Sequence, residues 1–313
     1  MKSTRRRFLQ TAAAGIGLTA LSPTLSAASE AKSFGPDEVG MLYDSTLCVG
    51  CKACVYACRS ENFDADSSSE LDEKALAEQR WHDAYELDYR TKNIIKLYQN
   101  PDDVNDFAFI KRQCNHCQSP GCVSACPVKA MTKNPVTGTV QYDKNICIGC
   151  RYCQMACPFK IPTFEWHMTF PKISKCELCR QTPKGTPACC RVCPAKAVIY
   201  DKRSILLAEA KRRLAENPDR YINKIYGEYD YGGTNVLYLS RVDFEKLGLP
   251  NLPNYSYAGV SENIQHTLYK TFNHVPIAPV ALYAALAAVA FVQHKRRGKK
   301  DAGNEAKKDG GEK

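Results

Sequence analysis

Sixteen of the 17 cysteines in this 313-residue chain fall into four short groups, and no other feature limits the possible folds as strongly. Each group opens with two cysteines separated by two residues and closes with two cysteines separated by three. In chain order the quartets are Cys48, Cys51, Cys54 and Cys58; Cys114, Cys117, Cys122 and Cys126; Cys147, Cys150, Cys153 and Cys157; and Cys176, Cys179, Cys189 and Cys193.

This spacing is typical of ligands to 4Fe–4S clusters. Such a cluster offers one coordination position on each of its four irons. Three closely spaced cysteines on a tight loop reach three positions of one cluster, and the fourth cysteine, in front of a proline, ligates the neighbouring cluster. Gly50 and Gly149 allow the loop to turn and to expose its N–H groups. Quartets therefore work in pairs, and sixteen thiolates predict four 4Fe–4S clusters.

Two other uses of cysteine fit the pattern less well. An exported chain can use its cysteines for disulfide bonds, but a chain of this length does not need such links. Zinc binds pairs of cysteines at this spacing, yet it has no use for a third cysteine two residues later or for a fourth in front of a proline. Cys189, and not Cys190, has the three-residue spacing to Cys193 that closes the other quartets. We therefore interpret Cys190 as a free thiol.

The N terminus has the pattern of an export signal. Three arginines at positions 5–7 precede an uncharged run that ends in small residues. A positive start, an apolar stretch and small residues together indicate a secretory signal over residues 1–27. The paired arginines followed by Phe8 and Leu9 resemble the twin-arginine type, whose cargo crosses the membrane already folded.

A second apolar stretch lies near the C terminus. Residues 271–294 contain no Asp, Glu, Lys or Arg, and about 20 residues of helix suffice to cross a bilayer. A buried core helix would also suit the composition, but the five Lys and Arg residues between 295 and 300 favour a transmembrane helix over 275–292. Positive charge marks the cytoplasmic side, which makes residues 293–313 a cytoplasmic tail and places the body of the protein on the periplasmic face.

The formal net charge of +10 comes almost wholly from the two ends of the chain. Residues 1–27 carry four positive charges, and residues 294–313 carry eight Lys and Arg against four Asp and Glu. The body between them is nearly neutral, so its charge gives no indication of nucleic-acid binding.

Short strands and one longer helix are predicted between the quartets. Residues 204–216 have the pattern of an amphipathic helix. We expect residues 64–73 to form an exposed loop and the tyrosine-rich residues 221–231 to form a loop over the core. Repeated units of loop, helix and strand indicate an α+β fold of two ferredoxin-like lobes. Residues 93–99 and 107–112 flank the turn-rich residues 100–103 and are expected to form a hairpin, and short strand signals fall at 140–142 and 198–200.

Eight Lys and Arg residues surround the quartets. Each cluster with four thiolates carries a charge of roughly −2, so nearby cations would tune its reduction potential. A solvated position on the surface explains any one of these residues equally well. They are Lys52, Arg59, Arg151, Lys160, Lys175, Arg180, Arg191 and Lys196.

The export signal, the four quartets in this order and the single apolar span resemble the iron–sulfur electron-transfer subunits of periplasm-facing respiratory enzymes. This family includes the beta subunits of formate dehydrogenase and of molybdenum reductases such as DMSO reductase. Within it, the stretches 40–51 and 261–270 resemble the members that serve nickel–iron hydrogenases. The resemblance implies a four-cluster core over 40–203, followed by a covering segment over 204–274 that leads to the membrane.

The family's pairing joins the first quartet with the fourth and the second with the third. One departure is Arg59, which stands where the family has a proline; it would loosen that turn or place a cation beside the cluster, with ligation intact. Carried over position by position, the pairing implies set 1 (Cys48, Cys51, Cys54 and Cys193), set 2 (Cys58, Cys176, Cys179 and Cys189), set 3 (Cys114, Cys117, Cys122 and Cys157) and set 4 (Cys126, Cys147, Cys150 and Cys153).

The resemblance implies an electron-transfer subunit without a catalytic site of its own. It would relay electrons between the catalytic subunits of a nickel–iron hydrogenase and an integral-membrane quinone-reactive subunit. A formate dehydrogenase or another molybdenum oxidoreductase is the alternative partner. A second class of function, an enzyme with its own quinone or haem site, finds less support because the chain has no G-x-G-x-x-G loop, no P-loop and no histidine inside the apolar span. His266 could contact a quinone-reactive subunit, although a surface histidine explains it more simply.

Overall fold

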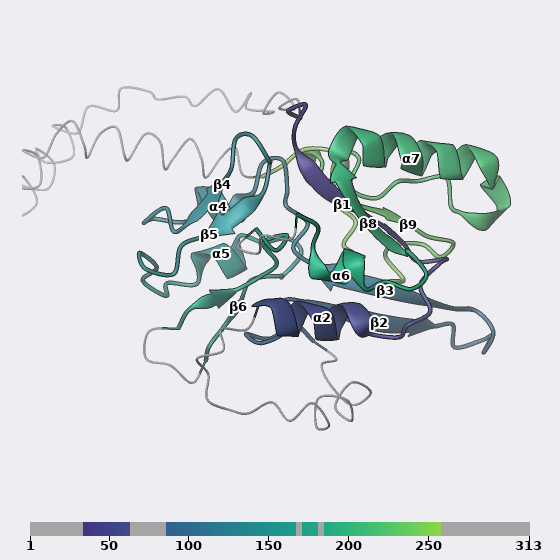
Figure 1. The fold of residues 1–313 in the computed structure, drawn as a ribbon, viewed down its shortest axis with the longest axis horizontal. Helices are drawn as coiled ribbons and strands as arrows, with labels where there is room; N and C mark the ends of the chain where they lie inside the picture. The colour runs from purple at the N-terminus through teal and green to yellow at the C-terminus, as the bar shows by residue number, and fades with distance from the viewer. Residues whose placement is uncertain (1–33, 63–85, 167–170, 181–184, 258–313) are drawn as a thin grey trace, which may run out of the picture. The chain divides into compact units, whose positions relative to one another are not determined.

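The computed structural model describes residues 34–62, 86–166, 171–180 and 185–257 (Figure 1). The chain divides into two compact units, Met1–Ser261 and Glu262–Lys313, and the described residues all belong to the first. No helix in this described part is long and apolar enough to cross a membrane. Several expected features lie outside the described residues, namely the export signal (1–27), the loop at 64–73, His266, the transmembrane helix (275–292) and the basic tail (293–313).

A three-stranded sheet forms the centre of this unit. Its strand order is β8–β1–β9, and β1 pairs antiparallel with β8 and parallel with β9. Met41 in β1 lies opposite Tyr200 on one side and Val236 on the other. The strands span Val39–Asp44 (β1), Val198–Lys202 (β8) and Val236–Leu239 (β9).

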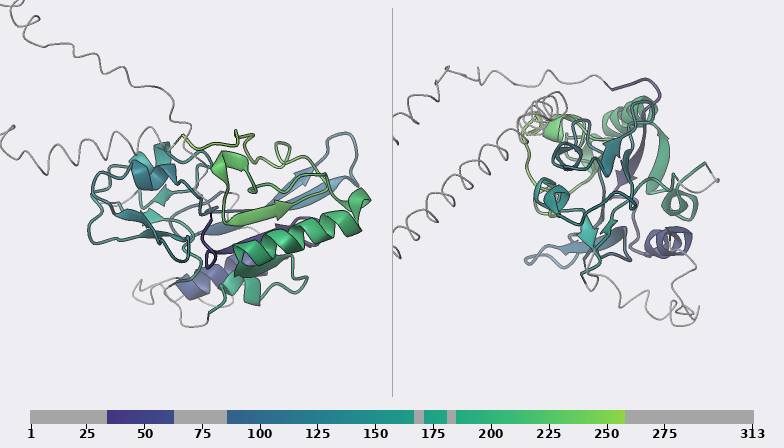
Figure 2. Two further views of the ribbon diagram at one scale, coloured as in Figure 1. Left: turned by 90° about the horizontal axis from the view of Figure 1, so that it is seen from above. Right: turned by 90° about the vertical axis from the view of Figure 1, so that its left-hand side faces the viewer.

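Both faces of this sheet are covered, which explains why every residue of β9 is buried. The helix α7 (Arg203–Glu216) follows β8 directly and lies along one face of the sheet (Figure 2). It packs Leu206 and Ala210, one helical turn apart, against Leu42 and Leu237. The predicted amphipathic helix at 204–216 is thereby confirmed. On the other face, alternate residues of β1 and β9 point towards the cysteine-bearing half of the molecule.

A long hairpin flanks this half. Its strands β2 (Asn93–Gln99) and β3 (Phe107–Gln113) are antiparallel, with Asn93 opposite Gln113 and Gln99 opposite Phe107. The predicted hairpin is confirmed, and its second strand extends one residue further than expected. The predicted strands at 140–142 and 198–200 are also confirmed, as β5 and as the first part of β8.

The remaining elements are short, as expected for an α+β fold whose loops carry most of the ligands. Each quartet contributes one helix, and these helices associate in two pairs, α2 against α6 and α4 against α5 (Figure 1). The helices span Ala53–Asn62 (α2), Gly121–Ser124 (α4), Tyr152–Met155 (α5) and Ala188–Arg191 (α6), and the 3-10 turns span Pro218–Arg220 (η1) and Asp230–Gly232 (η2). Two further hairpins pair β4 (Met131–Lys133) with β5 (Val140–Tyr142), and β6 (Thr163–Phe164) with β7 (Ile173–Ser174).

The tyrosine-rich segment 221–231 is irregular, but it forms part of the core and does not simply cover it. Tyr221, Tyr226 and Tyr231 are buried, whereas Tyr229 is exposed. The hydroxyl of Tyr226 donates a hydrogen bond of 2.7 Å to the carbonyl oxygen of Pro250. A buried tyrosine needs such a partner for its polar end, and this tertiary contact is not visible in the sequence.

Candidate metal centre

The four quartets share one backbone feature. In each quartet the residue in front of the second cysteine has a left-handed conformation, with φ of 69° at Gly50, 48° at His116, 70° at Gly149 and 55° at Leu178. Successive right- and left-handed residues direct their N–H groups into a concave site that favours negative charge, as in many iron–sulfur sites. Sequence analysis identified only the two glycines, because His116 and Leu178 are not typical of this conformation.

Three of the four quartets share a second backbone feature just after their last cysteine. A lysine three residues after the last cysteine is left-handed, at Lys129, Lys160 and Lys196. The next N–H group then points back at the cysteine: Ala130 donates to Cys126 Sγ at 3.2 Å, and Ala197 donates to Cys193 Sγ at the same distance. Hydrogen bonds of this kind stabilise a thiolate that binds iron.

The first quartet departs from this arrangement at Arg59. With no proline after Cys58, α2 continues to Asn62 and is ten residues long, whereas α4, α5 and α6 have four residues each. The turn is therefore replaced by helix rather than loosened. Arg59 Nη2 donates to Thr91 Oγ1 at 2.6 Å, and at the helix end Asn62 Nδ2 lies 3.5 Å from Cys179 Sγ.

The thiols of set 1 line a common cavity, which lies between the first and fourth quartets. Its walls include all four cysteines of the set together with Tyr43, Ile95, Lys111 and Val198. Burial raises the pKa of the Cys48 thiol, and the nearby thiols of Cys193 and Cys51 raise it further. The first and fourth quartets thus meet at one site.

The thiols of set 2 also face one another. Burial raises the pKa of Cys58 to about 12, with further contributions from the thiols of Cys189 and Cys179. Burial likewise raises the pKa of Cys176, and the thiols of Cys58 and Cys189 raise it further. Asn62 Nδ2 contacts both Cys58 Sγ, at 3.8 Å, and Cys179 Sγ.

Sets 3 and 4 combine the second and third quartets in the same way. The pKa of Cys117 is raised by burial and by three neighbouring thiols, and these three are the other members of set 3, Cys157, Cys114 and Cys122. Burial raises the pKa of Cys153 to about 12, and again the contributing thiols are the other members of its set, Cys126, Cys147 and Cys150.

The four sets follow one another in a single line. Cys54 of set 1 lies near Cys189 of set 2, and Cys176 of set 2 lies near Cys114 of set 3. Cys122 of set 3 in turn lies near Cys153 of set 4. Sets 1 and 4 are the two ends of this line. Each end contains an exposed cysteine, Cys51 in set 1 and Cys150 in set 4, and the other 15 cysteines are buried or half-buried.

The donor chemistry of each set fits a 4Fe–4S cluster. Burial and the proximity of like charges both oppose ionisation, so four closely grouped and mostly buried thiols do not readily become thiolates together without a positively charged centre. A 4Fe–4S cluster provides that centre and takes four thiolates. Among the described residues, no three Cys, His, Asp or Glu side chains are grouped so that they could hold a single metal ion.

Cys190 lies beside the site without joining any set. It is half-buried, and its thiol forms a hydrogen bond with the sulfur of Cys189. This hydrogen bond lowers the pKa of Cys189 and raises that of Cys190. The interaction favours Cys189 as the thiolate of the pair and Cys190 as its S–H donor.

Lys111, a residue of β3 that is 1% exposed, is a further part of the site that no sequence motif indicated. Lys111 lines the set 1 cavity, and its Nζ donates to Asn93 Oδ1. Of the eight cations singled out from the sequence, Lys175 is also buried, but its Nζ donates to the carbonyl oxygens of Val140 and Cys176. The composition of β3 gave no indication that one of its charged residues points inward.

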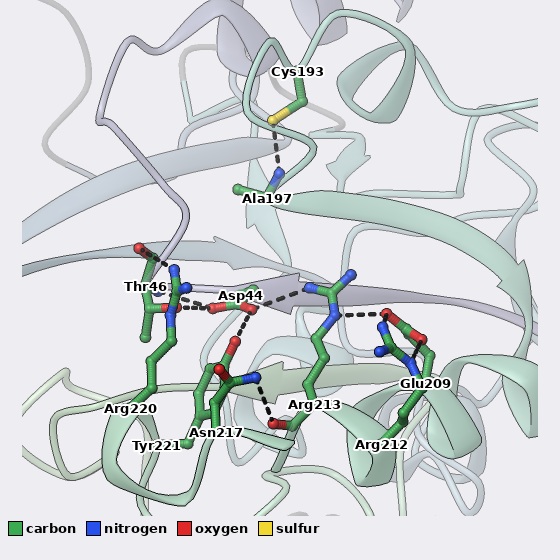
Figure 3. Close-up of polar contacts among 10 residues, drawn as sticks. All are labelled: Asp44, Thr46, Cys193, Ala197, Glu209, Arg212, Arg213, Asn217, Arg220 and Tyr221. Atoms are coloured by element: carbon green, nitrogen blue, oxygen red, sulfur yellow. Dashed lines mark hydrogen bonds and ion pairs between the residues drawn. The ribbon is translucent and has the colours of Figure 1, made fainter. Parts of the chain in front are cut away.

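Asp44 anchors the loop that leads to the first quartet (Figure 3). Its carboxylate is fully buried at the end of β1 and accepts hydrogen bonds from Thr46 N (3.0 Å), from Tyr221 Oη (2.7 Å) and from Arg213 Nη1 (3.1 Å). Arg220 donates from the opposite side to Thr46 Oγ1 at 2.8 Å. One carboxylate thus joins the loop, α7 and the tyrosine-rich segment.

Comparison with known proteins defines the class of this chain. Residues 105–203 match the family described as the 4Fe-4S dicluster domain. This range includes the second, third and fourth quartets. The cysteines of these three quartets therefore lie within a stretch that matches a 4Fe-4S dicluster domain.

Two relatives identify the family more closely. The chain is 42% identical to the hydrogenase-2 operon protein HybA of Escherichia coli O157:H7, over 91% of this chain and 94% of HybA. It is 32% identical to the formate dehydrogenase-O iron-sulfur subunit of Escherichia coli K12, over 85% of this chain and 86% of that subunit. The chain belongs to the family of iron–sulfur electron-transfer subunits that includes these two proteins, which confirms the resemblance seen in its sequence.

Proposed function

We propose that this protein holds four 4Fe–4S clusters, one in each of sets 1 to 4, and relays single electrons along them. The observation that carries the proposal is the order of the sets, in which neighbouring thiols link set 1 to set 2, set 2 to set 3 and set 3 to set 4. A 4Fe–4S cluster, when bound, accepts and gives up one electron at a time. The protein supplies the thiolates, the backbone donors to sulfur and the spacing that brings one set next to another.

The two exposed cysteines mark where electrons would enter and leave. Cys51 and Cys150 belong to the two terminal sets, while the sets between them contain no exposed cysteine. Between residues 146 and 166, around the third quartet, five large apolar side chains are exposed beside the exposed cation Arg151. They are Ile146, Ile148, Tyr152, Met155 and Trp166, and Met155 is 85% exposed. Exposed apolar side chains of this kind suit a lasting contact with a partner subunit.

A nickel–iron hydrogenase is the partner that similarity favours. HybA belongs to a hydrogenase-2 operon by its name, and the identity to HybA is ten percentage points higher than that to the formate dehydrogenase subunit. We therefore propose a relay between the catalytic subunits of a hydrogenase and an integral-membrane quinone-reactive subunit. A formate dehydrogenase or another molybdenum enzyme is the second candidate, supported by the relatives that carry that name.

The location proposed for the protein is the periplasmic face of the cytoplasmic membrane. Its support comes from the two ends of the sequence, the twin-arginine pattern over residues 1–27 and the apolar span over 275–292 with its basic tail. Replacement of Arg5 and Arg6 by lysine should retain the protein in the cytoplasm, as measured by cell fractionation. Normal export of this double variant would contradict the twin-arginine route.

The proposal is tested on the full chain, purified anaerobically in mild detergent together with its partners. Iron and acid-labile sulfide should each reach about sixteen atoms per polypeptide. A count near eight would contradict four clusters. Nickel in the same complex supports the hydrogenase, whereas molybdenum would replace it by the second candidate.

A further inference from the structure

The buried lysine of β3 calls for a physical explanation. Lysine is almost never fully buried unless its charge is paired, because an isolated ammonium loses its hydration. Lys111 is 1% exposed. The ionisable groups that act most strongly on its charge are thiols, those of Cys54, Cys189, Cys58 and Cys176. The first belongs to set 1 and the other three to set 2.

The position of Lys111 is fixed by its neighbours on both sides. Its Nζ donates to Oδ1 of Asn93 in the adjacent strand, and Asn93 is itself 1% exposed. The amide group of Asn93 donates in turn to the carbonyl oxygen of Cys54 at 3.3 Å and also hydrogen-bonds Cys58. Cys54 and Cys58 lie one turn apart in α2 and belong to different sets. The Lys111–Asn93 pair therefore lies where sets 1 and 2 meet.

The charge of Lys111 depends on these thiols. Burial alone would lower its pKa, but the thiolates of Cys54 and Cys189 raise it above the ordinary lysine value. Cysteines bind metal as thiolates. A loaded cluster with four thiolates carries a charge of roughly −2, so a buried ammonium beside two such clusters is held in its charged form by their attraction.

We propose that Lys111 is a fixed positive charge between the first two clusters, which raises the reduction potentials of both and offsets the repulsion between them. Reduction adds one negative charge to a cluster, so a nearby cation stabilises the reduced form more than the oxidised form. Two adjacent clusters of roughly −2 each repel one another, and a buried cation between them reduces that repulsion. The inference rests on the ligand sets proposed above and assigns a role to a residue outside them.

The test replaces the charge and keeps the volume, with Lys111→Met in the complete complex. The midpoint potential of each cluster is measured by redox titration followed by electron paramagnetic resonance. Signals of sets 1 and 2 are identified by their absence in Cys51→Ser and Cys179→Ser. The matched control is Lys96→Met, on the other strand of the same hairpin, where the lysine is partly exposed and pairs with Glu86.

We expect Lys111→Met to lower the potentials of sets 1 and 2 and to leave sets 3 and 4 unchanged. Lys111→Arg, which retains the charge, should restore most of the shift, and Lys96→Met should shift none of the four signals. A second outcome also supports the inference: Lys111→Met loses the signals of sets 1 and 2 alone, while Lys111→Arg keeps them. In that case the positive charge is needed to hold the two clusters side by side.

Three results would overturn it. The first is a set of four unchanged potentials in a fully loaded Lys111→Met protein. The second is equal loss of sets 1 and 2 in the Met and Arg variants, which would make shape rather than charge the cause. The third is loss of all four clusters, which would make Lys111 a general structural residue. A different result tests the proposed function itself. If the wild-type protein holds far fewer than about sixteen irons, the ligand sets are wrong, and the role inferred for Lys111 falls with them.

Discussion

The N–H group of Asp44 donates a hydrogen bond of 2.8 Å to the carbonyl oxygen of Ala197. The N–H group of the same alanine donates to Cys193 Sγ at 3.2 Å (Figure 3). A single residue thus connects the strand that leads into the first quartet with the last cysteine of the fourth. The first quartet ends at Cys58 and the fourth begins at Cys176, 118 residues later, yet set 1 needs cysteines from both.

The first prediction concerns Asp44→Asn. The change removes the charge that pairs with Arg213 in a site where the Asp44 side chain is fully buried and that of Arg213 is 17% exposed. Arg213 keeps its ion pair with Glu209, so the loss is that of hydrogen bonds to a buried charge, and the free energy of unfolding of the loaded protein should fall by about 1.5 to 3 kcal/mol. Denaturant titration under anaerobic conditions measures it.

The control for this prediction is Glu216→Gln. Glu216 pairs with Arg212 at the end of α7, the helix that also carries Arg213, and both side chains of this pair are about half exposed. Surface pairs of this kind contribute little, so the control should leave stability nearly unchanged. Equal effects of the two variants would show that Asp44 is no more important than a surface carboxylate.

A second prediction compares a cysteine that belongs to a ligand set, Cys150, with one that does not, Cys190. Cys150→Ser should remove one ligand of set 4 and reduce or abolish one of the four 4Fe–4S signals, because a serine oxygen is a poorer ligand for iron than a thiolate. Cys190→Ser should retain all four signals, because Cys190 only donates to Cys189. Electron paramagnetic resonance and iron analysis measure both variants. A cluster lost in the Cys190 variant would mean that the register of the fourth quartet is wrong.

A third prediction concerns the glycines in front of the second cysteine. In Gly50→Ala the new Cβ would lie 2.4 Å from a ring carbon of Phe109, at a backbone φ of 69°. The left-handed backbone and the overlap together should cost about 2 to 5 kcal/mol. In Gly149→Ala the backbone is the same, with φ of 70°, but the nearest atom is a ring carbon of Pro171 at 3.1 Å.

We therefore expect Gly50→Ala to be more harmful than Gly149→Ala. The loss should appear as a lower melting temperature and as lower iron content, with set 1 affected before the others. A milder effect at Gly50 than at Gly149 would show that Phe109 moves aside easily and that the overlap does not matter.

A fourth prediction follows from the long helix after the first quartet. Arg59→Pro would restore the proline that follows the last cysteine elsewhere, but here position 59 lies inside α2. Proline inside a helix costs about 3 kcal/mol, since it removes a hydrogen bond and clashes with the preceding turn. The variant should displace Asn62 from Cys58 and Cys179 and weaken set 2. Arg59→Ala keeps the helix and should retain set 2. A fully loaded Arg59→Pro protein would mean that α2 can end early without harm.

Much of this structure could be predicted from local patterns. The turn-rich residues 100–103 between 93–99 and 107–112 indicated the hairpin, and the spacing of apolar residues in 204–216 indicated α7, because a tight turn and an amphipathic helix are both local features of the chain. Strands β1 and β9 gave a weaker signal. They are covered on both faces and pair with each other across almost 200 residues, so neither alternation nor a nearby turn reveals them.

The spacing of cysteines was enough to determine the chemistry of this protein, since a ligand motif depends on a few residues that are close in the chain. The sequence alone thereby indicated iron–sulfur clusters and the family of the protein. Only the tertiary structure placed distant thiols into one line, turned Lys111 inward between two of the sets and left Cys51 and Cys150 exposed at the ends. These arrangements depend on contacts between segments far apart in the chain, and no local pattern of residues encodes such contacts by itself.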